Sequence, residues 1–291
     1  MTAPYTTLIS AEQLMALQAS GQPLMVFDCS FDLTNPGAGD GLYAEAHIPG
    51  AVYMHLDRDL SDKSGAADTA SGGRHPLPSP AKFATTLRRR GFNHAMQAVV
   101  YDRQGAQYCG RLWWMLKWCG HEAVAVLDGG LPAWQAAAGA VATGAPPAPA
   151  SEGNFEAHTG TGAPVRGVQD LAGALGHPGQ TVVDARAPAR FRGELEPLDP
   201  VAGHIPGALN RPFTDNFQPD GRFKPAAQLR AEFEQLLAGR PAASVVHHCG
   251  SGVTATPNIL AMEIAGLGRT ALFPGSWSEW CTTPGLPCAR G

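Results

Sequence analysis

The sequence lacks several features that would assign it to common classes of protein. Its 291 residues contain no Cys-x-x-Cys pair, and the six cysteines are scattered along the chain. This pattern argues against a zinc site and against a disulfide framework, and it favours reduced thiols. We therefore expect no metal, no cofactor and a cytoplasmic location.

Long apolar runs and an excess of one charge are also absent. No run approaches the length of a transmembrane helix, and residues 1–8 contain no basic segment of the kind that begins a secretory signal. With 21 basic and 25 acidic residues the formal net charge is -4, which indicates neither a nucleic-acid nor a membrane partner. The hydrophobic content of 44% is enough for two domains with buried cores.

The chain contains an internal repeat. A strand pattern that ends in Asp28 is matched by one that ends in Asp184, and residues 47–51 (His-Ile-Pro-Gly-Ala) return letter for letter at residues 204–208. Helical and strand patterns follow in the same order in both halves. Strands that alternate with helices predict an α/β fold, in which each half has a mainly parallel sheet with helices on both faces.

A change of composition separates the halves. Residues 143–157 begin with a stretch rich in Pro and Ala, which is typical of a stiff linker. We expect an N-terminal domain over residues 1–142 and a C-terminal domain over residues 158–291.

The C-terminal half contains a cysteine in an unusual setting. An apolar strand pattern over residues 245–248 runs into Cys249, and a helical pattern over residues 256–267 follows. We expect Gly250 and Gly252 to take positive φ, so that backbone N–H groups and a helix N-terminus surround the sulfur. This environment favours the thiolate and makes Cys249 a candidate nucleophile rather than a buried core residue.

The segment Cys249-Gly250-Ser251-Gly252-Val253-Thr254 resembles the active-site loop of the rhodanese superfamily, in its mercaptopyruvate-type form. Thiosulfate-type members usually carry two basic residues where this chain has Gly250 and Ser251. The resemblance covers nearly the whole chain and implies two tandem rhodanese-like domains.

The resemblance implies a sulfurtransferase that works through a persulfide on Cys249. A small-molecule donor, thiosulfate or 3-mercaptopyruvate, would supply the sulfur, and a thiol, cyanide or a protein would accept it. The backbone N–H groups of residues 250–254 would hold the outer sulfur. Ser251 would relay a proton or close the loop, and Thr254 would cap the helix.

An anionic donor needs a basic residue near Cys249. The substrate arginine of the family matches Arg190, whose guanidinium suits a carboxylate or a sulfonate. We expect Arg186 to pair with a structural carboxylate and Arg192 to face solvent. Mercaptopyruvate enzymes often carry a second arginine after a Glu-Pro pair, but here Leu198 stands in that position, so the choice of donor stays open.

Four histidines are candidates for supporting roles. His47 and His204 lie in the repeated turn, which favours a structural role. The resemblance offers His47, with Asp40, as a member of a relay to the serine. His247 and His248 precede Cys249 on a strand and should point to opposite faces, where burial in the layers is expected.

The first half lacks the nucleophile. The alignment of the repeats puts Asp102 opposite Cys249, within one position, and no Gly-x-Gly loop follows it. We expect a catalytically inactive domain. We expect it to act as a wall of the cleft between the domains, with Phe31, Tyr108, Trp113 and Trp114 as candidates, although core packing fits the two tryptophans better.

Two other functions compete with sulfur transfer. A phosphatase of the dual-specificity type shares this fold and its cysteine loop but needs an arginine that closes the loop, and after Ala255 no arginine follows until Arg269. A persulfide carrier or a protein-docking module of the same fold is the other alternative, against which the intact Cys249 loop argues.

Overall fold

The computed structural model describes residues 3–65, 68–145, 149, 151–158 and 162–291. The chain forms two compact units. Unit 1 contains Met1–Asp62, Pro78–Gly162 and Gln218–Phe223, and unit 2 contains Lys63–Leu77, Ala163–Phe217 and Lys224–Gly291. Part of the expected linker, at residues 146–148 and 150, lies outside the described residues. Segment Lys63–Leu77 therefore packs with the C-terminal half although it precedes most of the N-terminal half in sequence.

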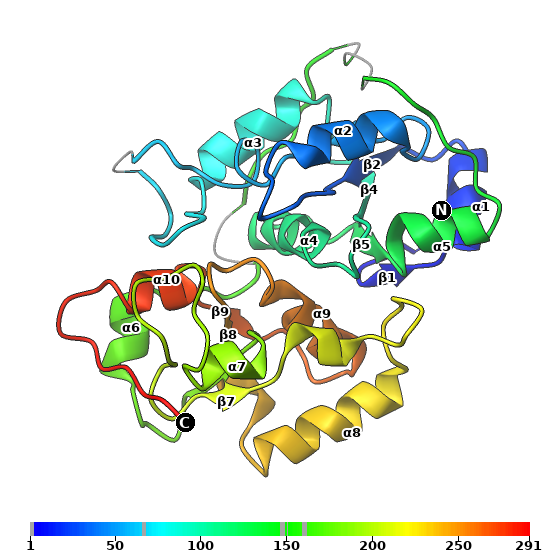
Figure 1. Ribbon diagram of the computed structural model, residues 1–291. Helices are drawn as coiled ribbons and strands as arrows, with labels where there is room; N and C mark the ends of the chain where they lie inside the picture. The colour runs from blue at the N-terminus through cyan, green and yellow to red at the C-terminus, as the bar shows by residue number, and fades with distance from the viewer. Residues whose placement is uncertain (1–2, 66–67, 146–148, 150, 159–161) are drawn as a thin grey trace. The chain divides into compact units, whose positions relative to one another are not determined.

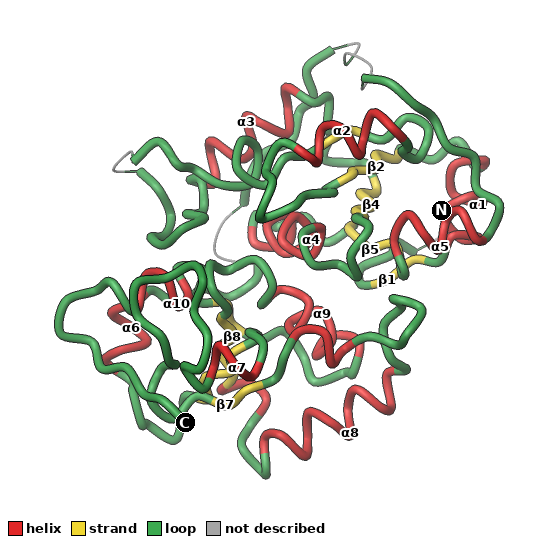
Figure 2. The backbone as a smooth tube through the Cα atoms, viewed as in Figure 1, coloured by secondary structure: helices red, strands yellow, loops and turns green. Residues whose placement is uncertain are grey.

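Unit 1 contains a parallel sheet in the order β1-β5-β4-β2-β3 among the described residues (Figures 1 and 2). Its strands are β1 (Leu8–Ile9), β2 (Leu24–Asp28), β3 (Val52–Tyr53), β4 (Gln97–Tyr101) and β5 (Val124–Leu127). Its helices are α1 (Ala11–Ala19), α2 (Ala38–Glu45), α3 (Pro80–Arg89), α4 (Cys109–Trp118) and α5 (Gly130–Ala136). Side chains of α1, α2 and α5 share one core cluster with the strands, and α4 packs against β4 and β5.

Local sequence signals explain where two of these helices begin. Ser10 accepts the N–H of Gln13 while the Gln13 side chain accepts the N–H of Ser10, which forms a complete capping box at α1. Ser79 accepts the N–H of Lys82 at the start of α3, and Pro80 supplies the preset φ of the first turn.

Unit 2 repeats this arrangement with the order β7-β6-β8-β9. Its strands are β6 (Thr181–Asp184), β7 (Leu209–Asn210), β8 (Val245–His248) and β9 (Ala271–Leu272). Its helices are α6 (Val168–Gly173), α7 (Pro188–Phe191), α8 (Ala226–Leu237), α9 (Thr256–Ile264) and α10 (Ser276–Trp280), with short 3-10 turns at Phe213–Asn216 and Ala242–Ser244. Side chains of α6 and α10 form a core cluster with β6, β8 and β9, while α9 packs with α8 and contacts β8 and β9. The predicted α/β fold with parallel sheets is confirmed.

The two sheets match strand by strand. Asp28 at the end of β2 pairs with Tyr101 on β4, and Asp184 at the end of β6 pairs with His248 on β8. Asp102 and Cys249 are therefore each the first residue after the equivalent central strand, with no offset. The short β1 has its counterpart in a single parallel bridge between Val165 and Leu272.

The repeated His-Ile-Pro-Gly-Ala turn has a structural function in both units. Nδ1 of His47 lies 2.8 Å from the carbonyl oxygen of Tyr43, and the imidazole stacks on that ring. Nδ1 of His204 lies 2.8 Å from the carbonyl oxygen of Phe191, and the His204 imidazole stacks on the Phe191 ring in the same way. Asp40 pairs with Arg58 instead of His47. The relay offered for His47 and Asp40 is therefore wrong, and the structural role is confirmed.

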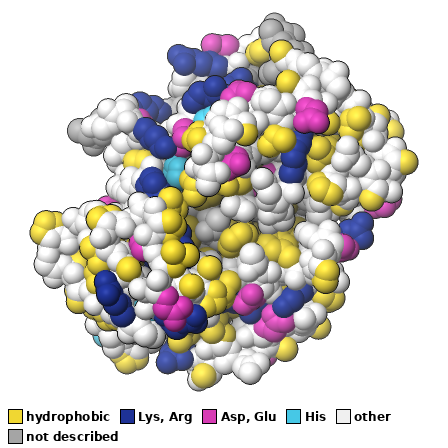
Figure 3. All heavy atoms as spheres, in the orientation of Figure 1, with side chains coloured by type: hydrophobic (Ala, Val, Ile, Leu, Met, Phe, Trp, Pro, Cys, Tyr) yellow, Lys and Arg dark blue, Asp and Glu magenta, His cyan; other side chains and the backbone are white. Residues whose placement is uncertain are grey.

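Charged side chains of both signs are interspersed on the face drawn in Figure 3. No helix among the described residues is long and apolar enough to cross a membrane. Among those residues no group of three or more His, Cys, Asp and Glu side chains is arranged to hold a metal ion.

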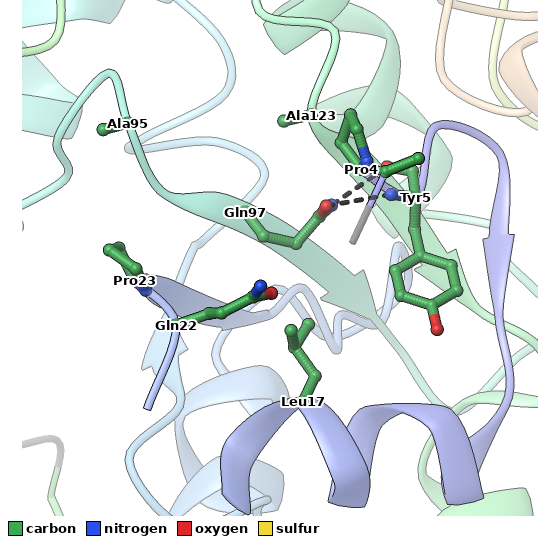
Figure 4. A pocket seen from close by; sticks show the side chains of 9 residues that line it. Pro4, Tyr5, Leu17, Gln22, Pro23, Ala95, Gln97 and Ala123 are labelled. Carbon is green, nitrogen blue, oxygen red and sulfur yellow. Dashed lines mark hydrogen bonds between the residues drawn. The ribbon is translucent and has the colours of Figure 1, made fainter. Parts of the chain in front are cut away.

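A small pocket in unit 1 has a mostly apolar lining (Figure 4). Gln97 crosses it, accepting the N–H of Tyr5 and donating to the Tyr5 carbonyl, each at 3.0 Å. No cysteine, histidine or arginine lines this pocket. These bonds tie the segment before β1 to β4, which is a structural task.

Candidate active site

Cys249 stands at the carboxyl end of β8 and is buried. Its N–H donates to Oγ of Ser276 at 3.1 Å, and its carbonyl accepts the N–H of Trp277 at 3.0 Å. The carbonyl of Gly250 accepts the N–H of Ser278 at 2.9 Å. The start of α10 thus fixes the backbone on which the sulfur is carried.

The two glycines of the loop serve different purposes. Gly252 has φ of 73°, and a Cβ there would lie 2.2 Å from the carbonyl oxygen of Pro274, so only glycine fits. Gly250 is not in the left-handed region, and the expectation of positive φ was wrong at that position. A Cβ on Gly250 would instead point at arginine side chains.

The helix after the loop starts without the expected cap. The N-cap of α9 is Ala255, which offers no side-chain acceptor, and Thr256 Oγ donates to the carbonyl of Val253 at 2.8 Å. The helix begins at Thr256 as predicted, but the prediction that Thr254 caps it was wrong, because Ala255 occupies the N-cap position. The helix ends at Ile264 rather than at residue 267, since Gly266 takes φ of 69°.

Several N–H groups of the loop have no acceptor in the part of the chain that the structure describes. They are the N–H groups of Gly250, Ser251, Val253 and Thr254. A run of unpaired N–H groups beside the first turn of a helix attracts anions. The loop is therefore chemically suited to hold a negatively charged sulfur.

Ser251 has a histidine partner that the sequence did not reveal. Its Oγ lies 2.7 Å from Nδ1 of His75, and both side chains are buried. The two residues are 176 positions apart in sequence. Serine and histidine at this distance can pass a proton between them, next to Cys249.

His75 belongs to the segment Lys63–Leu77, which docks on α10. The N–H of Arg74 donates to Oγ of Ser278 at 2.9 Å. Gly73 has φ of 85°, and a Cβ there would lie 2.4 Å from the carbonyl oxygen of Gly275. Burial raises the pKa of Glu279, whose carboxyl group lies against Gly72. The paired glycines let the segment approach α10 closely enough to bring Arg74 and His75 to the loop.

A buried ion pair supports the loop from below. Arg186 donates to both carboxylate oxygens of Asp184, at 2.7 to 3.2 Å, and its guanidinium lies over the ring of Trp277. Burial alone would raise the pKa of Asp184, but the neighbouring His248 imidazole and Arg186 guanidinium lower it below its usual value. The structural role predicted for Arg186 is confirmed.

The two other arginines of this stretch differ in environment. Arg192 is exposed and pairs with Glu194, as predicted. Arg190 donates to Glu196 at 2.6 Å and to Asp199 at 3.3 Å. Its Nη1 lies 3.5 Å from the point where a Cβ of Gly250 would stand. Arg190 thus lies next to the Cys249 loop.

A second arginine, which the sequence analysis missed, lies at the same place. Nη2 of Arg74 is 3.0 Å from the Cβ point of Gly250, and Nη1 of Arg74 pairs with Asp199. The only signal in the sequence is the pair Gly72-Gly73 before two basic residues, in a connection longer than its counterpart in the second half. Nothing in the spacing relates that connection to Cys249.

The histidines before Cys249 are packed inside unit 2. Nε2 of His247 faces the sulfur of Met262 on α9 at 3.2 Å, whereas His248 lies on the opposite face near Asp184 and Phe273. Burial lowers the pKa of His247 to about 3 and also lowers that of His248. The His247 imidazole is therefore neutral at physiological pH, and the predicted burial of both histidines on opposite faces is confirmed.

The aromatic residues offered as a wall of the active site are core residues of unit 1. Phe31 and Tyr108 are buried and pack edge to face, with ring centroids 5.3 Å apart. Trp113 and Trp114 are also buried. The expectation of core packing for the tryptophans is confirmed.

Comparison with known proteins assigns this architecture. The model of the rhodanese-like domain matches residues 10–137 and again residues 167–283. A probable 3-mercaptopyruvate sulfurtransferase of Pseudomonas aeruginosa is 45% identical over 98% of both chains. The chain belongs to the rhodanese family of sulfurtransferases. As such an enzyme it moves sulfur from a small-molecule donor to an acceptor.

Other rhodanese relatives carry both donor names. A putative thiosulfate sulfurtransferase, SseB of Mycobacterium tuberculosis, is 40% identical over 100% of this chain and 99% of its own length. The crystal structure of SseA from Escherichia coli, a 3-mercaptopyruvate sulfotransferase by its description, has a TM-score of 0.76 and 31% identity, covering 94% of this chain and 100% of its own. Names alone therefore leave the donor of this rhodanese unassigned.

Proposed function

We propose that this enzyme takes sulfur from 3-mercaptopyruvate onto Cys249 and passes it to a thiol or to cyanide. The Cys249 thiolate attacks the donor sulfur, and an S–S bond forms. The C–S bond breaks, and its electron pair moves to the methylene carbon of the departing pyruvate enolate. The proton of the donor thiol ends on that carbon, and the persulfide stays on the enzyme. An acceptor thiolate then attacks the outer sulfur and releases the Cys249 thiolate.

The hydrogen bond between Ser251 and His75 is the observation that carries the choice of donor. A pyruvate enolate must gain a proton on carbon, whereas sulfite leaves thiosulfate without needing one. Ser251 stands two residues after Cys249, and its Oγ is 2.7 Å from the His75 imidazole. This pair can take the proton from the donor thiol and deliver it to the enolate, which is a task that thiosulfate does not pose.

Positive groups around Cys249 support an anionic donor. Arg190 lies beside Gly250, and four loop N–H groups have no acceptor among the described residues. The guanidinium suits the carboxylate of the donor, and the loop N–H groups suit the charge on the outer sulfur of the persulfide. The name of the Pseudomonas aeruginosa relative agrees with this donor.

The setting that we infer for this chemistry is a reducing cytoplasm. All six cysteines are unpaired, and the exposed Cys288 would not stay so in an oxidising compartment. A low-molecular-weight thiol is accordingly the acceptor that we propose, with cyanide as its laboratory substitute.

Steady-state turnover with each donor, at fixed cyanide, tests the proposal. We expect kcat/KM for 3-mercaptopyruvate to exceed that for thiosulfate by at least about 100-fold, the usual contribution of acid–base assistance. Cys249→Ser should abolish turnover, while Cys288→Ser, a change of an exposed cysteine, should leave it intact. A preference for thiosulfate would refute the choice of donor, and turnover by Cys249→Ser would refute the nucleophile.

A further inference from the structure

We propose that Arg74 is the second arm of an anion clamp whose first arm is Arg190, and that the clamp holds the carboxylate and keto oxygens of an α-keto thiol over Gly250. The inference rests on the proposed function and deepens it. It assigns a substrate-binding residue to a segment that lies outside the C-terminal half of the sequence.

Both guanidinium groups converge on one point. A Cβ built on Gly250 would lie 3.0 Å from Nη2 of Arg74 and 3.5 and 3.6 Å from the two Nη atoms of Arg190. Gly250 has no positive φ that would explain its identity. The missing side chain instead leaves space between the two guanidinium groups, directly beside Cys249.

Each arginine keeps one end without a protein acceptor among the described residues. Arg74 uses Nη1 for Asp199, and Arg190 uses Nε and Nη2 for Glu196 and Asp199. In the part of the chain that the structure describes, Nη2 of Arg74 and Nη1 of Arg190 have no acceptor, and Nε of Arg74 is buried without one. Guanidinium donors next to a nucleophile that lack a protein acceptor are suited to an anionic ligand.

One carboxylate holds both arms in place. Oδ1 of Asp199 pairs with Arg74 and Oδ2 pairs with Arg190, and the Asp199 side chain is only 3% exposed. The backbone of Asp199 is itself held in place, because its N–H donates to Oε1 of Glu196 at 3.2 Å. The distance between the two arms is therefore set before a donor binds, which reduces the ordering cost of binding.

The second arm is needed because the usual position for it is apolar. Leu198 follows the Glu196-Pro197 pair, and its side chain is exposed. An α-keto acid presents a carboxylate and a keto oxygen, and one fork cannot satisfy both groups. Segment Lys63–Leu77, fixed on α10 by the N–H of Arg74 and by Gly73, brings the second fork.

Arg74 variants test the clamp in steady state. Arg74→Ala should lower kcat/KM for 3-mercaptopyruvate by about 30-fold, mostly through KM, as expected for one lost charge-assisted interaction. Arg74→Lys, which keeps the charge and the pairing with Asp199, should recover part of this loss. Arg192→Ala, a change of an exposed arginine in the same unit, is the matched control and should stay within twofold of the wild type. An Arg74→Ala enzyme within twofold of the wild type would overturn the proposal.

Gly250→Ala tests the clamp by placing a methyl group in the space between the guanidinium groups of Arg74 and Arg190. The backbone at this position accepts alanine, and the new methyl group meets only the ends of flexible arginine side chains. We expect a protein as stable as the wild type that binds the donor about tenfold more weakly, because the methyl group occupies the seat between the guanidinium groups. Unchanged KM would place the donor elsewhere.

Alkylation of Cys249 separates failure of the clamp from failure of the proposed function. Iodoacetate carries a carboxylate next to its reactive carbon, whereas iodoacetamide is neutral and reports the reactivity of the thiol alone. The clamp predicts that Arg74→Ala lowers the ratio of the two rates, read by mass spectrometry on the Cys249 peptide, by at least about fivefold. This readout does not require turnover of any donor. An unchanged ratio would overturn the clamp, whereas a Cys249 that reacts with neither reagent would overturn the nucleophile and with it the proposed function.

Discussion

Two loops in this molecule follow equivalent central strands and differ in what fills them. After β4 the carboxylate of Asp102 accepts four backbone N–H groups, from Gln104, Ala106, Tyr108 and Cys109, at 2.8 to 3.1 Å. After β8 the residue is Cys249, and four loop N–H groups have no acceptor among the described residues. In unit 1 the Asp102 carboxylate is the anion that the loop N–H groups bind. In unit 2 the equivalent loop N–H groups are left available to a ligand.

The comparison explains how one duplicated unit is catalytic and the other is not. A carboxylate that occupies the N–H groups of its own loop is a structural element, because those groups are no longer available to a substrate. A cysteine without such bonds can accept a sulfur atom and share the same kind of N–H groups with it. The Asp102 loop therefore shows, within the same molecule, how the N–H groups of such a loop bind an anion.

A second pair of equivalent residues, Asp28 in unit 1 and Asp184 in unit 2, also differs in its charged neighbours. Asp28 and Asp184 end equivalent strands, and each accepts the N–H of the residue two positions later, Ser30 or Arg186. Burial raises the pKa of Asp28, whereas the pKa of Asp184 is lowered despite burial because His248 and Arg186 stand beside it. The arginines that surround Cys249 have no counterpart at these positions of unit 1.

The largest expected effect comes from placing the aspartate found at position 102 of unit 1 at the equivalent position, 249, of unit 2. Cys249→Asp should abolish sulfur transfer completely, because the carboxylate cannot form a persulfide. The new carboxylate should accept loop N–H groups, so we expect a free energy of unfolding about 1 kcal/mol above that of Cys249→Ala. Urea unfolding of both variants measures this difference. A less stable Cys249→Asp would show that the two loops are not alike.

Asp102→Ala should break the other side of the comparison. Four N–H groups then lose a charged acceptor in a buried place, and the free energy of unfolding should fall by about 3 kcal/mol. Glu45→Ala, which changes an exposed carboxylate of the same unit, is the control and should cost less than about 1 kcal/mol. Equal losses in urea titrations would contradict the structural role of Asp102.

Ser251→Ala should separate the two donors. We expect kcat for 3-mercaptopyruvate to fall by about 100-fold, because the enolate loses its proton source, while turnover of thiosulfate stays within about threefold. The acid limb of the pH profile for 3-mercaptopyruvate should change as well, since a merely structural serine would not affect it. Equal losses with both donors would make Ser251 a loop-closing residue only.

The smallest effect concerns the buried aspartates and pH. A raised pKa at Asp28 favours the protonated form, so its stabilisation is present below about pH 4 and is lost as pH rises through the folded value. Asp28→Asn should therefore gain stability relative to the wild type as pH rises from 4 to 7.

Asp184 provides the opposite sign. Its lowered pKa means that its stabilisation is present above about pH 4 and is lost as pH falls through the folded value. Asp184→Asn should accordingly lose stability relative to the wild type as pH rises from below 4. The measurement is the free energy of unfolding of each variant relative to the wild type at several pH values. If this difference changed with pH in the same direction for both variants, the assignment of both aspartates would be contradicted.

The sequence predicted most of what local pattern and duplication control. The equivalence of Asp102 with Cys249 and the buried strands follow from periodicity and the repeated turn. The structural pairing of Arg186 follows from its place just after Asp184. These features depend on residues that lie near one another along the chain.

What the sequence could not predict depends on long-range contacts. Arg74 and His75 reach the loop through a segment that packs with the other half of the chain, and no spacing encodes that route. The sequence analysis therefore offered His47 for the relay and found one arginine where the structure brings two together. The predicted cap of α9 was wrong for a local reason, because Ala255, which has no side-chain acceptor, occupies the N-cap position.

The most direct test of the difference between the two loops is the location of the transferred sulfur. The protein is incubated with 3-mercaptopyruvate without acceptor, digested under non-reducing conditions and examined by mass spectrometry. The account predicts that the peptide with Cys249 gains the mass of one sulfur atom, that no peptide with another cysteine does, and that cyanide removes the gain. A stable sulfur on Cys29 or Cys109 of unit 1, or none on Cys249, would contradict it.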